Sequence, residues 1–288
     1  MNDDRRPVLV TGANGTTGSE VVRALVAAGI PTRVLVRDRA KAASLPSGIE
    51  ILVGELSDRA TLDAACRGAR SVFMASFDHP DQIALQQNLI DASRSAGVGM
   101  IVRLSGSSAA PDASSRAMRI HAAGDAQLAR SGLNYCILKP SWFHQNFFTY
   151  CPGGRLRLPA GDGRLPFIDV RDIAAVAVKA LTEPGHDGKS YLLLGPELLN
   201  HREVADILSK ATGRDFVYED VAPETWRQES VAAGMSEDVA TQVAEIFARV
   251  KAGHSAISGG DLEPLLGRPG ITLAEFAKDH AAALVKQI

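Results

Sequence analysis

The 288-residue sequence has few cysteines, few aromatic residues and no strong charge of either sign. Its three cysteines, Cys66, Cys136 and Cys151, lack the spacing of a metal site and leave one thiol unpaired in any disulfide scheme. Reduced thiols are typical of cytoplasmic proteins, so we expect no metal site and a cytoplasmic location. The formal net charge of −2 gives no reason to expect nucleic acid or an anionic membrane as a partner.

Long apolar runs are missing as well. No run approaches the length of a membrane-spanning helix, and the first residues, M-N-D-D-R-R-P, contain no apolar segment typical of a signal peptide. A hydrophobic fraction of 45% nevertheless allows a sizeable core. These features predict that the protein has no membrane or nucleic-acid partner. A homodimer is compatible with them.

Three glycines near the N-terminus are the strongest signal in the sequence. The apolar run 8–10 leads into T-G-A-N-G-T-T-G at 11–18, and a helical pattern follows. A glycine-rich turn between a strand and a helix binds a dinucleotide pyrophosphate through unpaired backbone N–H groups and the positive end of the helix dipole. An ordinary turn is the alternative, but the place after the first strand favours the cofactor site. The residues expected to hold the cofactor here are Gly12, Asn14, Gly15, Thr16, Thr17 and Gly18.

Short apolar runs alternate with helical patterns through the first half of the chain. This alternation predicts an α/β fold with a Rossmann-type, doubly wound parallel sheet. We expect residues 1–150 to form this dinucleotide-binding domain and residues 151–288 to form a smaller, mostly helical portion on the substrate side. The segments 166–170 and 190–195 are predicted to continue the sheet. The stretch 150–166 reads as a long loop.

The end of the second expected strand decides between the two nicotinamide cofactors. An acidic residue there binds the ribose hydroxyls of NAD, whereas the 2′-phosphate of NADP needs cations. Arg37 comes first in this sequence, Asp38 second, and Lys41 lies on the next turn. Asp38 keeps NAD open as the second choice, and the two cations would otherwise be solvated surface groups. We predict NADP.

Further cofactor contacts are expected after the later strands, because parallel sheets bind ligands beyond the carboxyl ends of their strands. The stretch 54–58, G-E-L-S-D, would lie near the adenine, or would otherwise be a polar turn before a helix. The loop 75–79 is expected to pass the nicotinamide ribose. The residues named for these contacts are Glu55, Leu56, Ala75, Phe77 and Ser105.

Seven motifs together resemble the NmrA-like branch of the atypical short-chain dehydrogenases, and they cover most of the chain. They are the glycine stretch, V-R-D-R-A-K-A (36–42), G-E-L-S-D, H-A-A-G-D (121–125), S-G-L-N-Y-C-I-L-K-P (131–140), F-I-D-V-R-D-I-A (167–174) and Y-L-L-L-G-P-E (191–197). That branch includes triphenylmethane dye reductases, quinone reductases and redox sensors that bind NADP(H) and act through a protein partner. The resemblance therefore implies either hydride transfer from NAD(P)H to a small, flat, conjugated acceptor (a quinone, dye or enone) or a sensor role.

Most short-chain dehydrogenases use a Tyr and a Lys one helical turn apart. The match in this sequence, Tyr135 and Lys139, falls in a segment that reads as a strand, where the two residues would be separated by roughly 13 Å. The helix expected over 115–130 contains no Tyr. The usual proton donor is therefore missing, which argues against alcohol dehydrogenation more than against quinone reduction.

His121 is the candidate catalytic residue. The resemblance places it where isoflavone reductases carry a Lys and where dye and quinone reductases often carry His. An imidazole with a near-neutral pKa would deliver a proton or hold a substrate oxygen, and Asp125, four residues later, would orient the ring. A surface or locally bonded histidine is the alternative.

Aromatic residues gather in one place: six of the fifteen lie between Tyr135 and Tyr150. A flat acceptor would stack against such side chains, although ordinary core packing is the alternative for them. The residues expected to contact the substrate are Trp142, Phe143, Asn146 and Phe147.

Overall fold

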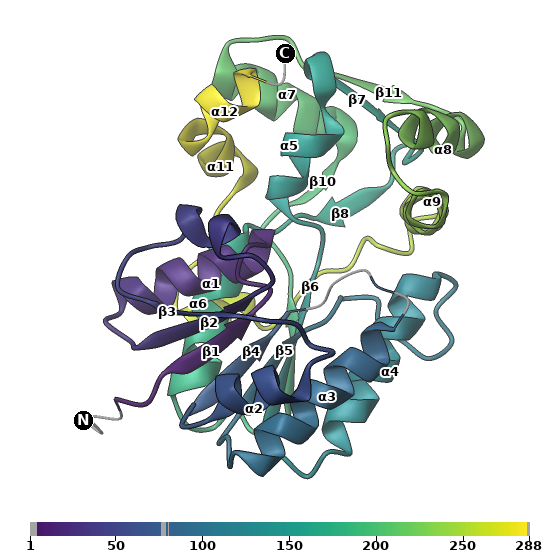
Figure 1. The fold of residues 1–288 in the computed structure, drawn as a ribbon. Coiled ribbons are helices and arrows are strands. Elements are labelled where there is room, and N and C mark those ends of the chain that lie inside the picture. Colours follow the sequence, from purple (N-terminus) through teal and green to yellow (C-terminus); the bar gives the residue numbers. More distant parts are fainter. Residues whose placement is uncertain (1–4, 76–78, 80, 287–288) are drawn as a thin grey trace. The chain divides into compact units, whose positions relative to one another are not determined.

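The computed structural model describes residues 5–75, 79 and 81–286. Its main sheet has seven strands in the order β3-β2-β1-β4-β5-β6-β9 (Figure 1). The pairings from β3 across to β6 are parallel, which confirms the doubly wound α/β fold. The strands are β1 (Val8–Thr11), β2 (Thr32–Val36), β3 (Glu50–Val53), β4 (Ser71–Met74), β5 (Ile101–Leu104), β6 (Tyr135–Pro140) and β9 (Lys189–Leu193).

Helices cover both faces of this sheet, so most side chains of its central strands are apolar. Val8, Leu9 and Val10 of β1 are all fully buried. Leu62, Leu89 and Leu128 reach one face from three helices, while α1 and α6 pack together on the other face (Figure 1). These helices are α1 (Thr16–Ala27), α2 (Arg59–Cys66), α3 (Gln82–Ser95), α4 (Arg116–Ala129) and α6 (Val170–Thr182), and η1 (Arg39–Ser44) is a short 3₁₀ turn.

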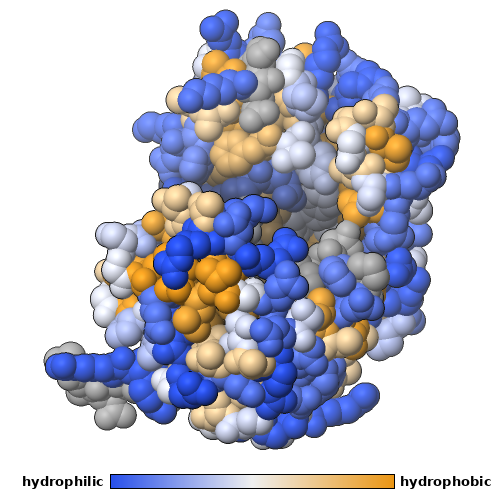
Figure 2. Space-filling model, viewed as in Figure 1, coloured by the Kyte–Doolittle hydropathy of each residue, from blue (hydrophilic) through white to orange (hydrophobic). Residues whose placement is uncertain are grey.

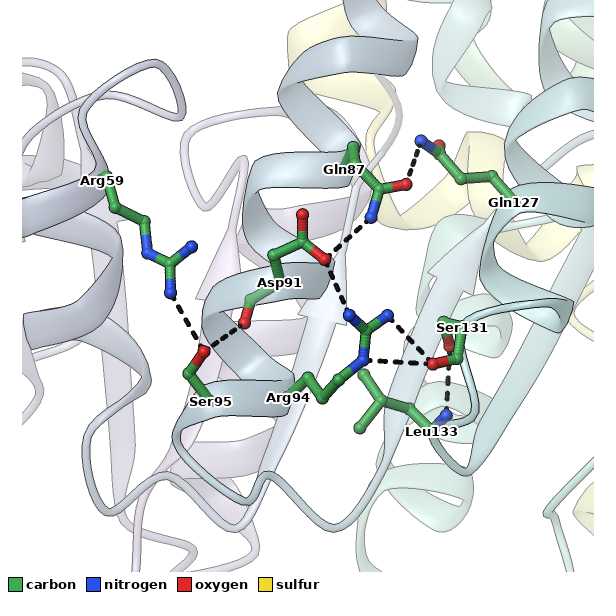
Figure 3. A network of polar contacts seen from close by, with 8 residues as sticks. All are labelled: Arg59, Gln87, Asp91, Arg94, Ser95, Gln127, Ser131 and Leu133. Carbon is green, nitrogen blue, oxygen red and sulfur yellow. Dashed lines mark hydrogen bonds and ion pairs between the residues drawn. The ribbon is translucent and has the colours of Figure 1, made fainter.

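Polar side chains join α3 to the chain beyond α4 (Figure 3). Arg94 donates from Nε and Nη2 to the carbonyl oxygen of Ser131, at 3.2 and 3.0 Å, and also pairs with Asp91. Gln87 donates to Asp91 at 2.9 Å and accepts from Gln127 at 2.7 Å. Exposed pairs of this kind each contribute little stability. Their shared effect is to fix the turn that leads from α4 into β6.

The remaining residues, 112–119, 141–169 and 193–288, form a second compact unit, which is mostly helical as expected. The first unit comprises 1–111, 120–140 and 170–192. The two units therefore alternate along the chain, and the expected boundary at residue 150 falls inside a stretch of the second one. The remaining elements are η2 (His144–Asn146), α5 (Phe147–Tyr150), η3 (Pro152–Gly154), β7 (Arg155–Leu158), β8 (Arg164–Pro166), β10 (Leu198–Asn200), α7 (His201–Thr212), β11 (Val217–Asp220), α8 (Pro223–Ala232), α9 (Glu237–Lys251), α10 (Leu262–Leu266), α11 (Leu273–Asp279) and α12 (Ala281–Val285).

Two expectations about extended segments need correction. The stretch 150–166 is not a plain loop, since β7 pairs with β11 and β8 pairs with β10 in two small sheets. The segment 166–170 does not continue the main sheet, because Ile168 makes only an isolated bridge to Phe143 and α6 begins at Val170. The segment 190–195 does join the main sheet, since its residues 190–193 make up most of β9.

The core of the second unit contains a buried histidine. His201 begins α7, stacks on Tyr218 at 5.6 Å between ring centroids and meets Phe167 edge-on at 5.5 Å. Burial lowers the pKa of His201 to about 4. The ring is therefore neutral at pH 7, and in the folded chain it becomes protonated only at acidic pH.

We expect acid to destabilise this unit less in a His201→Phe variant than in the native chain. The unfolded histidine takes up a proton near pH 6.5, whereas the folded one does so only near pH 4, so its stabilising contribution is complete above pH 6.5 and is lost as the pH falls toward 4. Between pH 7.5 and 5 this group alone should cost about 2 kcal/mol. Both tryptophans lie in this unit, so tryptophan fluorescence during urea unfolding at the two pH values measures the loss.

His254→Phe is the matched control, because His254 is exposed. Its free energy of unfolding should differ between pH 7.5 and pH 5 by as much as that of the native chain. If the difference is equally large in His201→Phe, His201 is not the group whose protonation destabilises the unit.

Candidate functional site

The glycine turn lies at the carboxyl end of β1, and two of its glycines are required by close contacts. Gly12 has a φ of +66°, and a Cβ there would lie 2.7 Å from the Cβ of Ala75. A Cβ on Gly18 would collide with the carbonyl oxygen of Gly12. The first turn of α1 therefore packs directly on the backbone of the turn, which is the geometry expected of a dinucleotide-binding site.

The N-terminus of α1 is open to an anion. Gly15 is its N-cap, no side chain caps the helix, and its first turn contains no acidic residue. The first backbone N–H groups of a helix have no intrahelical partner, and the helix dipole adds positive potential there. Asn14, Gly15 and Thr16 are exposed, whereas Thr17 is buried. These residues fit a pyrophosphate.

The residues after β2 differ in how far they are engaged by other groups of the chain. Asp38 accepts a hydrogen bond from the backbone N–H of Ala40 at 2.9 Å and so caps η1. Arg39 donates to the carbonyl of Ile51 at 3.1 Å. Arg37 and Lys41 are exposed and have no ionic partner among the described residues. Arg37 and Lys41 are therefore available to pair with a phosphate, whereas the carboxylate of Asp38 already caps η1.

The stretch 54–58 has the geometry of its polar-turn role, while the adenine contact stays a prediction. Asp58 caps α2 by accepting from the N–H of Ala60 at 3.0 Å, which is the polar-turn role. Leu56 is half-buried against the core, and Glu55 is exposed. Val53, at the end of the edge strand β3, is 50% exposed, and Figure 2 shows a hydrophobic area over this edge of the sheet. An apolar surface thus adjoins the expected adenine position.

The residues after β4 can be followed only in part. Ala75 is buried and lies against Gly12, so it belongs to the wall of the glycine turn. Phe77 lies outside the described residues.

Ser105, directly after β5, belongs to a buried polar cluster that the sequence analysis missed. Arg103 of β5 is fully buried and forms an ion pair with Asp125 of α4. Ser105 donates to the other oxygen of Asp125 at 2.8 Å, and Lys139 of β6 lies 3.6 Å from that same oxygen. Gln86 of α3 accepts from Arg103 at 3.4 Å. The strands β5 and β6 and the helices α3 and α4 therefore all contribute side chains to this cluster.

Gly124 leaves the space that the guanidinium occupies. A Cβ at this position would collide with Nη2 of Arg103 and would lie 2.7 Å from Oε1 of Gln86. The sequence does carry a signal for this cluster, since M-I-V-R-L-S places a charge inside an otherwise apolar strand. Buried charges of this kind require a partner. Only the fold identifies the partner.

His121 differs from its expected description in two ways. Asp125 does not orient its ring, because the carboxylate is engaged by Arg103 and Ser105, and Nδ1 of His121 has no hydrogen-bond partner among the described residues. Burial and the nearby Arg103 charge lower the pKa of His121 to about 4. The imidazole is therefore neutral at physiological pH.

Tyr135 and Lys139 both lie on β6, as expected, so they cannot form the helical Tyr–Lys pair. Lys139 instead joins the Asp125 cluster.

The expected substrate contacts all belong to the second unit. Phe147 is 2% exposed and packs against Phe167, with ring centroids 5.3 Å apart, so its ring is part of the core rather than of a binding surface. Trp142 is half-buried and packs on Phe247 at 5.1 Å. Phe143, directly before η2, and Asn146, the last residue of η2, are both half-buried.

The part of the chain that the structure describes contains no group of three metal-ligating side chains. No helix in it combines the length and the apolar character needed to cross a bilayer.

Comparisons with known proteins agree with this geometry. Residues 4–268 match the model of the NmrA-like family. The NAD(P)H azoreductase of Xenophilus azovorans is 40% identical over 281 residues, which cover 96% of this chain and 98% of that protein. The NADPH-dependent quinone oxidoreductase of Escherichia coli, solved with NADPH, has a TM-score of 0.83 and 26% identity, with 94% and 99% of the two chains covered. The triphenylmethane reductase of Citrobacter sp., solved with NADP(H), has a TM-score of 0.80 and 27% identity, with 96% and 99% covered. These matches confirm the resemblance carried by the motifs.

Proposed function

Because the chain belongs to the NmrA-like family, we propose that it is an NADPH-dependent reductase that transfers hydride to a small, flat, conjugated acceptor such as a quinone, a dye or an enone. The observation that carries the proposal is the uncapped N-terminus of α1 over the glycine turn, a place for the pyrophosphate. The cofactor supplies the hydride. Azo compounds, quinones and triphenylmethane dyes, which the three compared enzymes are named for, are all conjugated acceptors.

The missing tyrosine supports this acceptor class. Hydride addition to a conjugated system spreads the new charge over several atoms, so a strong acid is not needed in the same step. The neutral ring of His121 fits such a reaction, because an N–H of a neutral imidazole can donate a hydrogen bond to an acceptor oxygen without transferring its proton. The substrate contacts of Trp142, Phe143 and Asn146, and a homodimer, remain predictions.

A panel of acceptors tests the proposal directly. We expect NADPH oxidation, followed by its absorbance, to depend on at least one quinone, azo or triphenylmethane dye, or enone, and not on simple alcohols or ketones. No acceptor-dependent oxidation across the panel would favour the sensor role instead, which requires cofactor binding but no turnover.

NADP preference is tested at Arg37. Because a guanidinium beside a phosphate forms charge-assisted hydrogen bonds, Arg37→Ala should weaken NADPH binding by about 1.5–3 kcal/mol and leave NADH binding nearly unchanged. Calorimetric titration with each cofactor measures both. Arg39→Ala is the control, since Arg39 is engaged by a backbone carbonyl. Equal losses for NADPH and NADH in Arg37→Ala would defeat the NADP assignment.

For His121, the pH profile distinguishes the two roles. A hydrogen-bonding ring with a pKa of about 4 predicts no inflection from this group between pH 5.5 and 8. His121→Ala should lower kcat about 100-fold by removing one donor, with NADPH affinity unchanged. His254→Ala, at an exposed histidine, should match the native enzyme. Native turnover in His121→Ala would make this histidine structural.

A further inference from the structure

Lys139 is the most exposed member of the cluster around Asp125. Its side chain is 27% exposed, against 10% for Asp125 and none for Arg103. It is the penultimate residue of β6. Ser105 lies directly after β5, and the glycine turn lies directly after β1. Because these strands are parallel, all three sites belong to the same edge of the sheet, where such folds bind their ligands.

The cluster around Asp125 contains two positive charges, on Arg103 and Lys139, and one negative charge, on Asp125. Arg103 alone neutralises Asp125, Gln86 and Ser105 are uncharged, and burial keeps His121 neutral. Lys139 therefore adds an ammonium that no other carboxylate among the described residues balances. An excess cation at a ligand-binding edge attracts anions.

The ammonium also keeps its hydrogen-bonding capacity. One oxygen of Asp125 is engaged by Arg103 and the other accepts from Ser105 at 2.8 Å. Nζ of Lys139 lies 3.6 Å from the second oxygen, which is an ion-pair distance but longer than a hydrogen bond. An ammonium has three N–H donors. Asp125 therefore orients the ammonium without using up its donors.

We propose that Lys139 binds the acceptor oxygen on which negative charge develops during hydride transfer. This inference rests on the proposed reductase function. When bound, NADPH would supply the hydride and be oxidised to NADP⁺. A C–H bond forms at the β carbon of the conjugated carbonyl acceptor, the C=C π electrons shift to a new C=C bond with the carbonyl carbon, and the carbonyl π electrons move to oxygen, which gives an enolate. Lys139 holds this oxyanion until a proton from water neutralises it.

A purely structural role would give a different pattern. If Lys139 served only to pair with Asp125, its loss would alter stability and not anion binding. Lys139→Met keeps the aliphatic stem and removes the charge, whereas Lys139→Arg keeps the charge. Lys210→Met removes an exposed cation from the last turn of α7 and is the matched control.

The test measures binding of 2,4-dinitrophenolate, a flat phenolate that is anionic at neutral pH, to the complex with NADP⁺ by calorimetry. Lys139→Met should weaken binding at least tenfold and lower kcat/KM about 10- to 100-fold. Lys139→Arg should restore most of both, and Lys210→Met should match the native protein. The neutral ether 2,4-dinitroanisole should bind all four proteins equally. If Lys139→Met does not fold, Lys139→Gln replaces it.

Two failures can be told apart. If the native protein reduces an acceptor but Lys139→Met binds dinitrophenolate and turns over within twofold of it, the role of Lys139 is overturned and the reductase function stands. If no acceptor is reduced, the reductase function fails, and with it the oxyanion role. Phenolate binding that depends on Lys139 would then identify an anion site of another purpose.

Discussion

A fully buried guanidinium constrains the centre of this protein. Arg103 lies inside β5, where a charge is costly unless it is paired and hydrogen-bonded. The neighbouring residues meet these requirements. Asp125 supplies the opposite charge and Gln86 a hydrogen-bond acceptor, and Gly124 leaves room for the guanidinium because it has no Cβ. The same charge acts on His121 and, with burial, keeps that ring neutral. Burial is the larger of these two causes, so Arg103 contributes to the protonation state of His121 without determining it alone.

The cofactor edge depends on a second constraint, which is steric. The first turn of α1 can lie on the carbonyl of Gly12 only because residue 18 has no side chain. Close packing leaves the N-terminal N–H groups of α1 facing outward with no cap to satisfy them. An anion is the natural partner for such a terminus, and the nearby Arg37 and Lys41 offer charge for a second one. This charge is the basis of the proposed preference for NADP, which carries a 2′-phosphate in addition to its pyrophosphate.

Local signals made the cofactor half predictable from sequence, and distant pairings did not. The glycine turn and the alternating strands are encoded within a few residues, and the structure has both of them. The strands β7 and β8 were missed because their partners, β11 and β10, lie far along the chain. Asp125 was assigned to His121 by helical spacing alone, since nothing local reveals that Arg103 takes the carboxylate. A residue's partner in another element is a property of the fold.

The chemistry of the edge follows from what is neutral there and what is charged. Without a tyrosine on α4, and with His121 neutral at physiological pH, this helix provides no acid for an isolated alkoxide. It offers a hydrogen-bonding ring and, in Lys139, an ammonium held by Asp125. Preorganised donors and charges of this kind stabilise negative charge as it develops on a substrate oxygen. In a conjugated acceptor that charge is shared over several atoms, so its stabilisation is enough without an acid in the same step, and the electrostatics of the cluster support the proposed acceptor class.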